Sequence, residues 1–202
     1  MNYTILANTA ALTTGGLLQI PNELIPFMEY VDKEVAPKNF LELGLCNGGT
    51  FYIWCGIAVR GGIKLGIDLP NGNWGAPHIR SEKEIETNKH AFQTFAPNAY
   101  VLFDDTKEKN SIDWVKNKLN GEELDFLFID ADHSYEGVKT DFYNYLPFVR
   151  KGGFIAMHDI KKTLKHSDNG CHVYKFWEEL EGEKKEFVDA DYDWGGIGII
   201  KV

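Results

Sequence analysis

The chain has 202 residues, of which 44% are hydrophobic and 25% charged, an ordinary composition for one globular domain with its own core. Its net charge of −9 disfavours a surface that binds nucleic acid, since phosphate contacts need clustered Lys and Arg. No apolar run approaches the ~20 residues of a membrane span, and no basic residue precedes Lys33 as a signal peptide would require. Three scattered cysteines suggest a reducing compartment. We therefore expect a cytoplasmic protein without membrane contact.

The first part of the chain has two kinds of pattern. Residues 1–20 are rich in Thr, Ala and Gly and weakly patterned, so we expect an N-terminal arm. Residues 21–35 have the apolar spacing of a helix. We therefore divide the chain into an arm and helix, residues 1–35, and one folded domain, residues 36–202.

Within that domain, strand and helix patterns alternate. The expected strands are 40–44, 63–68, 99–103, 124–130 and 153–158, and the expected helices lie near 48–60, 82–95, 109–119, 136–149 and 171–181. The strands are continuous apolar runs, which is typical of a parallel sheet covered on both faces by helices. The alternation predicts a doubly wound α/β sheet. Two last strands, 186–190 and 196–202, have only a short turn near 192–196 between them and should form an antiparallel hairpin.

A glycine turn follows the first expected strand. Residues Glu42 to Thr50 have the sequence ELGLCNGGT. Gly44 lets the chain leave the strand sharply, and Gly48 and Gly49 let backbone amides approach a ligand at the start of the next helix. The spacing G-x-x-x-G-G differs from the dinucleotide pattern G-x-G-x-x-G. A plain turn between strand and helix is the alternative interpretation.

Acidic residues end the second and third strands. Asp68 comes ~20 residues after the glycine turn, where an acid can accept hydrogen bonds from ribose hydroxyls. A helix cap or solvated loop residue is the alternative. One of Asp104 and Asp105 is placed to face a base, or to cap the next helix. Ligands of such sheets bind beyond the carboxyl ends of the strands, where all these residues fall.

The segment from Phe126 to Ile160 is the most informative. Asp130 and the pair His158-Asp159 end two neighbouring strands, which lie ~4.8 Å apart, so these side chains can converge on one divalent cation. Such a cation lowers the pKa of a coordinated hydroxyl. His133, with an ordinary pKa of ~6.5, suits a general base. Alternatively, Asp130 or Asp132 caps the next helix and His133 only binds a loop. We expect Glu136 and Asp141 on a solvated helix face.

Together, the glycine turn, the acids after three strands and the terminal hairpin resemble class I S-adenosylmethionine-dependent methyltransferases over residues 36–202. The segments FIDADHSYEGVKTD and KGGFIAMHDI resemble more narrowly the metal-dependent small-molecule O-methyltransferases, including catechol, macrolide-sugar and rhamnosyl types, and the cephalosporin-hydroxylase-like group. The resemblance implies a Rossmann-like, mostly parallel sheet of seven strands in the order 3-2-1-4-5-7-6, with strand 7 antiparallel. It also implies S-adenosyl-L-methionine as cofactor.

The resemblance also implies residue roles. Cofactor-binding residues would be Glu42, Gly44, Asn47 and Gly48 for the methionine part, Asp68 for the ribose, and Asp104 or Asp105 near the adenine. Asp130 and His133 would be catalytic, with His133 the general base, and Asp130, His158 and Asp159 would bind the metal. Relatives usually have Asp or Glu where His158 stands. Histidine there favours Mn²⁺, Fe²⁺ or Zn²⁺ over Mg²⁺, and a site without metal stays open.

The predicted function is methylation of a hydroxyl on a small molecule or sugar. Two loops, 70–81 and 161–170, are candidate lids or plain connectors. A nicotinamide-dependent oxidoreductase would need the missing dinucleotide pattern, and a nucleic-acid methyltransferase would need motifs and a basic stripe that the chain lacks. A non-catalytic cofactor-binding protein on the same fold is a further alternative. The sequence indicates neither the acceptor nor the oligomeric state.

Overall fold

The computed structural model describes residues 1–70 and 80–202. Its helices are α1 (Tyr3–Thr14), α2 (Pro21–Tyr30), α3 (Gly49–Ile57), α4 (Glu82–Gln93), α5 (Lys109–Leu119), α6 (Tyr135–Tyr145), α7 (Leu164–Asp168) and α8 (Val173–Glu179). Its strands are β1 (Phe40–Leu43), β2 (Lys64–Asp68), β3 (Ala99–Phe103), β4 (Leu124–Ile129), β5 (Val149–His158), β6 (Lys184–Phe187) and β7 (Ile197–Lys201). A π turn and a 3₁₀ turn extend α2 and α6 at Val31–Val35 and Leu146–Phe148.

The strands form one seven-stranded sheet in the order β3-β2-β1-β4-β5-β7-β6, which confirms the predicted topology. β1 to β5 run parallel, and β7 lies antiparallel to both β5 and β6. The register aligns Leu43 with Ile129, and Ile129 with Met157. The carboxyl ends of β1, β4 and β5 therefore meet at one edge.

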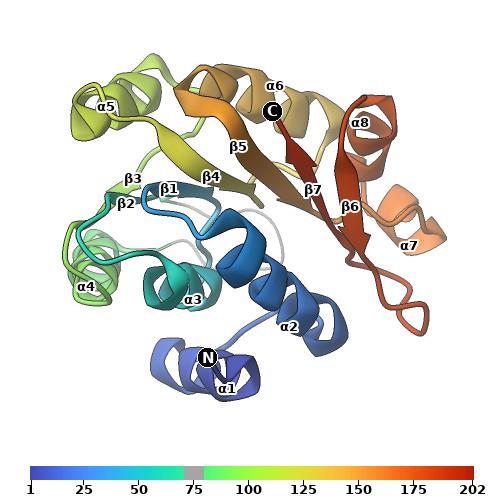
Figure 1. The fold of residues 1–202 in the computed structure, drawn as a ribbon, viewed down its shortest axis with the longest axis horizontal. Coiled ribbons are helices and arrows are strands. Elements are labelled where there is room, and N and C mark those ends of the chain that lie inside the picture. The colour runs from blue at the N-terminus through green and yellow to red at the C-terminus, as the bar shows by residue number, and fades with distance from the viewer. Residues whose placement is uncertain (71–79) are drawn as a thin grey trace.

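Helices cover both faces of the sheet (Figure 1). α1 to α4 lie on one side, while α5, α6 and α8 lie on the other. In β4, Phe126 and Phe128 join the core beneath α2 and α3, whereas Leu127 and Ile129 join the core beneath α6 and α8. Successive side chains of a strand point to opposite faces, so a strand covered on both sides is apolar throughout.

The N-terminal residues differ from the expected arm. Tyr3–Thr14 form a helix in which Asn2 caps the first turn and Gly15 ends the last, with φ +79°. Ala7 and Ala10 are its buried residues. Alanine is the best helix former but contributes little apolar contrast, which is why the pattern looked weak.

Two differences concern the last third of the chain. Leu164–Asp168, within the loop expected at 161–170, form the short helix α7, capped by Thr163. β6 ends at Phe187, so residues 188–196 connect it to β7, a longer connection than the expected turn. Outside the undescribed residues 71–79, no helix is long and apolar enough to cross a membrane.

Candidate active site

A cavity of about 610 Å³ opens at the carboxyl edge of the sheet. It is lined by parts of residues 16–19, 44–50, 68–69, 80, 105–107, 130–133, 158–159, 165–171 and 194. The glycine turn, the end of β2 and the ends of β4 and β5 thus share one space, as expected for ligand binding in a doubly wound sheet.

Gly44 makes a close backbone approach. Its φ is +86°, and a Cβ built on it would lie 2.0 Å from the carbonyl oxygen of Asp130. Only glycine fits, so the turn after β1 passes directly against the end of β4. Gly48 caps α3 with φ +82°, and a Cβ there would lie 2.5 Å from Cε1 of Phe92. Both glycines are thus required by close contacts within the protein.

Some of the predicted methionine-binding residues line the cavity, and others lie behind its wall. Gly44 and Asn47 line the cavity together with Thr50. Glu42 is fully buried and accepts a hydrogen bond from the Thr50 hydroxyl, but it is absent from the described cavity wall, as is Gly48. Burial raises the pKa of Glu42 well above its usual value, against the lowering effect of Thr50. Direct cofactor contacts of Glu42 and Gly48 remain predictions.

Asp68 ends β2 inside the cavity, beside an arginine. Leu45 N donates to Asp68 Oδ1 at 3.2 Å, and Arg80 Nη1 lies 2.7 Å from Asp68 Oδ2. Arg80 also donates to the carbonyls of Cys46 and Leu69. Burial raises the pKa of Asp68 although Arg80 opposes this. Arg80 belongs to the candidate lid 70–81, but a lone Arg in a Gly/Pro-rich loop carries no signal for its partner, so the pair with Asp68 was not predicted. Trp74 and His78, in the same candidate lid, lie outside the described residues.

Asp104 and Asp105 have different surroundings. Asp105 lines the cavity with Thr106 and Lys107. Asp104 Oδ2 accepts from Asn110 Nδ2 at 2.9 Å, and its Oδ1 accepts from the backbone N–H of Asp105. Both carboxylates support the turn into α5, since Asp105 Oδ1 also accepts from Lys107 N at 2.9 Å, and Asp105 is the member of the pair that lines the cavity.

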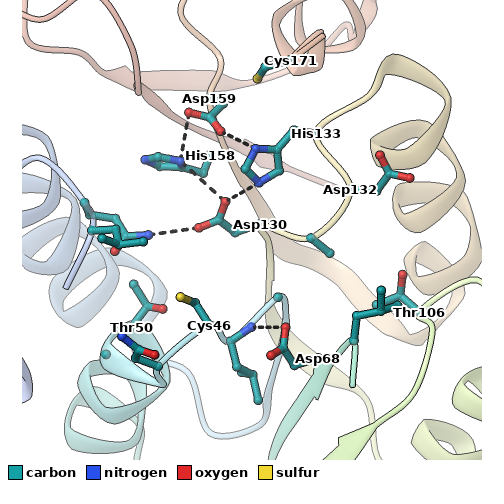
Figure 2. Close-up of a pocket in the computed structure, with 18 of the residues that line it drawn as sticks. Cys46, Thr50, Asp68, Thr106, Asp130, Asp132, His133, His158, Asp159 and Cys171 are labelled. Carbon is teal, nitrogen blue, oxygen red and sulfur yellow. Dashed lines mark hydrogen bonds and ion pairs between the residues drawn. The ribbon is translucent and has the colours of Figure 1, made fainter. Parts of the chain in front are cut away.

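His133 lies between two carboxylates (Figure 2). Its Nε2 is 3.4 Å from Asp130 Oδ1, and its Nδ1 is 3.0 Å from Asp159 Oδ2. His158 Nδ1 lies 3.2 Å from Asp159 Oδ1 and 3.6 Å from Asp130 Oδ1. The structure therefore brings together the four residues that the sequence placed at two strand ends. We call them the His–Asp cluster.

Asp159 has a left-handed backbone, with φ +63°. This conformation is costly for a residue other than glycine and persists only where the surroundings impose it. Ile160 N and Lys161 N donate to the carbonyls of Gly196 and Gly195, which fixes the chain immediately after Asp159. The strained turn directs the Asp159 carboxylate toward His133 and His158, as Figure 2 shows.

The cluster shifts the pKa of its members in opposite directions. Burial would raise the pKa of Asp159, but His158, His133 and His166 together lower it well below its usual value. Burial would lower the pKa of His158, but Asp159 and Asp130 raise it to about 9. Burial likewise would lower the pKa of His133, but the hydrogen bonds that its ring donates to Asp130 and Asp159 hold this pKa well above its usual value. With a pKa of about 9, His158 is therefore an imidazolium at neutral pH while no cation is bound.

The structure adds further neighbours to the cluster and its cavity. Gln19 Nε2 donates to Asp130 Oδ2 at 3.0 Å. His166, on α7, places Nε2 3.2 Å from Asp159 Oδ1. Cys171 and Trp194 also line the cavity. The Gln19 contact joins segments 111 residues apart in the chain, and no local motif marks it.

Ser134 caps α6, so neither Asp130 nor Asp132 is the helix cap that the sequence offered as an alternative. Asp132 accepts from Lys107 Nζ and Ser134 N, and Glu136 is exposed, as expected. Asp141, expected on a solvated face, is completely buried. It lies one turn after Val138 on the face of α6 that contacts the sheet, so its position overrides its polarity.

Two groups of side chains in the described residues fit a divalent cation. One is the predicted set Asp130, His158 and Asp159, and the other is His133, Asp159 and Cys171, each with ligand atoms within 4.8 Å of one another. His158 Nε2 is buried with no hydrogen-bond partner among the described residues. Mixed imidazole and carboxylate donors suit Mn²⁺, Fe²⁺ or Zn²⁺.

Comparison with known proteins assigns the chain to a family. Residues 41–160 match the Methyltransferase domain family, and the chain belongs to this family. The uncharacterized protein y4gI of Sinorhizobium fredii is 23% identical over 158 residues, which are 77% of this chain but only 16% of that protein.

Solved structures share the fold over the whole chain. An O-methyltransferase from Bacillus cereus in complex with SAH has a TM-score of 0.63 and 18% identity, with 99% of this chain and 90% of that chain covered. The MycE methyltransferase of the mycinamycin biosynthetic pathway, in complex with Mg and SAH, has a TM-score of 0.58 and 16% identity, with 100% of this chain and 55% of that chain covered. The Rossmann-like fold of methyltransferases is thereby confirmed.

Proposed function

We propose that this chain is an S-adenosylmethionine-dependent methyltransferase that methylates a hydroxyl on a small molecule or sugar. The observation that carries the proposal is one cavity that joins the glycine turn and Asp68 to the His–Asp cluster, in a chain of the methyltransferase family. The bound SAH and Mg named for the structural relatives support a methyl donor and a cation here.

The cofactor end of the cavity has the required groups. Gly44, Asn47, Thr50, Asp68 and Asp105 all line this cavity. Gly44, Asn47 and Thr50 would hold the methionine part, Asp68 would accept ribose hydroxyls, and Asp105 would lie near the adenine. The volume of about 610 Å³ is within the range of cofactor sites. The bound cofactor would supply an electrophilic methyl group on a sulfonium.

The acceptor end is the His–Asp cluster. His133 would take the proton of the acceptor hydroxyl, which is a poor nucleophile while protonated. Because its pKa is raised, His133 must first lose its own proton to act as a base. Asp130, His158 and Asp159 would hold a divalent cation, whose contribution when bound would be to acidify and orient a hydroxyl. Free Cys46, Cys55 and Cys171 agree with a reducing, cytoplasmic location, which we also propose.

A thermal-shift comparison tests the proposal. A ligand that binds the folded state raises its apparent stability. We expect SAM and SAH to raise the melting temperature where NAD does not, and Mn²⁺ or Fe²⁺ to add a further rise that EDTA removes. No shift with SAM or SAH would contradict the proposed cofactor. A shift with SAH but none with any divalent cation would contradict the metal site alone.

A further inference from the structure

The hydrogen bond from Gln19 to Asp130 connects the N-terminal segment to the His–Asp cluster. Gln19 Nε2 donates to Asp130 Oδ2 at 3.0 Å across 111 residues of sequence. Gln19 precedes residues 41–160, the part that matches the methyltransferase family. The contact is therefore a feature of this chain that the family match does not include.

The two oxygens of Asp130 have different partners. Oδ2 receives the Gln19 amide, while Oδ1 lies 3.4 Å from His133 Nε2 and 3.6 Å from His158 Nδ1. The Asp130 side chain is only 14% exposed, so few water molecules compete as donors. Rotation of the Asp130 carboxylate would break the hydrogen bond from the Gln19 amide. This hydrogen bond therefore favours the orientation that directs Oδ1 to the two rings.

The segment that carries Gln19 is held on both sides. A Cβ at Gly49, the first residue of α3, would lie 2.8 Å from Leu17 Cδ1 and 2.9 Å from the carbonyl oxygen of Gly16. After Gln19, Ile20 is buried and precedes the first residue of α2. The segment is therefore packed against the glycine turn before Gln19 and anchored in the core after it. Little further ordering is needed to present the amide.

We propose that Gln19 is a positioning residue that holds the Asp130 carboxylate with Oδ1 toward His133 and His158. The N-terminal segment is then part of the active site, although it lies outside the family's matched residues. Gln19 acts through Asp130 and takes no part in proton or methyl transfer. The consequence for metal binding rests on the proposed function, whereas the orientation of Asp130 does not.

The test compares two substitutions that each remove an amide-to-carboxylate hydrogen bond. Gln19→Met keeps the side-chain length and loses the donor. Asn22→Ala is the matched control, because Asn22 Nδ2 donates to Asp189 Oδ2 at 2.7 Å at the surface. The readout is the ring ¹H–¹⁵N signals of His133 and His158 at one fixed pH. We expect Gln19→Met to shift both signals and Asn22→Ala to leave them unchanged.

Ring signals that are unchanged in Gln19→Met, or equally shifted in Asn22→Ala, would overturn the inference. Gln19→Glu, which keeps the shape but replaces the donor with a second carboxylate, should also shift the signals and serves if Gln19→Met destabilises the fold.

Binding of Mn²⁺ and SAH by calorimetry gives a second readout. Loss of a partner that orients a metal ligand typically weakens metal binding ~10–100-fold. We expect such a loss of Mn²⁺ affinity in Gln19→Met, with SAH affinity within about twofold of wild type. Wild-type Mn²⁺ affinity in this variant would overturn the inference. Failure of the wild-type protein to bind SAH would contradict the proposed function instead, and the ring signals would still decide the role of Gln19.

Discussion

At the scale of single residues, the protonation state of His133 decides whether this residue can act as a general base. A histidine between two carboxylates keeps its proton to a higher pH than a free one, because Asp130 and Asp159 stabilise the imidazolium against the effect of burial. The predicted general base therefore needs a higher pH to become free of its proton than its ordinary pKa of ~6.5 would imply.

The first prediction follows from this proton. Turnover should rise as the pH passes the raised pKa of His133, so the acidic limb of the pH–rate profile should lie above pH ~6.5. His133→Ala should lower turnover ~10²–10⁴-fold and remove that limb, while SAH affinity stays nearly unchanged. Steady-state rates across pH measure this. A variant that keeps the acidic limb would show that another group is the base.

The second prediction concerns Asp68. Asp68→Ala should weaken SAH binding by ~1–3 kcal/mol, because two ribose hydroxyls would lose a charged acceptor and Arg80 would lose its counter-ion. Calorimetry gives the affinity. Asp113→Ala, which removes an exposed acid paired with Lys109, is the control and should bind SAH like wild type. Wild-type affinity in Asp68→Ala would refute the assignment.

At the scale of elements, the sheet was predictable and the contacts between distant segments were not. Continuous apolar runs such as Phe126–Ile129 fix a strand buried on both faces, and acids directly after such runs must meet at one edge. The positions of Arg80, His166 and Gln19 depend on how loops and the N-terminal segment pack across that edge. Asp141 shows the same limit, since only the orientation of α6 decides which of its polar residues is buried.

The third prediction uses the burial of Asp141 in α6. Burial raises its pKa from 3.8 to about 7, so the unfolded chain loses this proton more readily than the folded one. The associated stability is present below pH ~4 and is lost as the pH rises to about 7, at a cost of about 4 kcal/mol at most. Asp141→Asn should therefore raise the free energy of unfolding at pH 8 and change it little at pH 4. Urea unfolding at both pH values measures this, and an equal change at both would exclude the buried carboxyl as its source.

The fourth prediction concerns how α2 holds the β6–β7 connection. Glu23 is fully buried and accepts from Asp189 N and Gly196 N, both at 2.8 Å. Glu23→Ala leaves two donors without their acceptor and should cost roughly 2–5 kcal/mol in the free energy of unfolding. Glu23→Gln keeps one acceptor oxygen and should cost less. If the two variants unfold alike in urea, the hydrogen bonds contribute little.

At the scale of the whole molecule, one layered fold places two kinds of chemistry side by side. The proposed cofactor wall comes from the ends of β1 and β2, and the His–Asp cluster comes from the ends of β4 and β5. These two groups of residues are neighbours because β1 pairs with β4 in the sheet. The sequence predicted this arrangement through its strand ends, whereas the closure of the cavity by residues 16–19 depends on tertiary packing.

The missing side chain of Gly44 affects the distance between the two molecules that would bind in the cavity. The turn after β1 touches the end of β4 at this residue, where any Cβ would meet the Asp130 carbonyl. Transfer of a group between two bound molecules requires the reacting atoms to be ~3–3.5 Å apart. A larger residue at position 44 would push the two walls of the cavity apart. The reacting atoms would then lie farther apart than this range of distances. Donor and acceptor could then each be held well and still be too far apart to react.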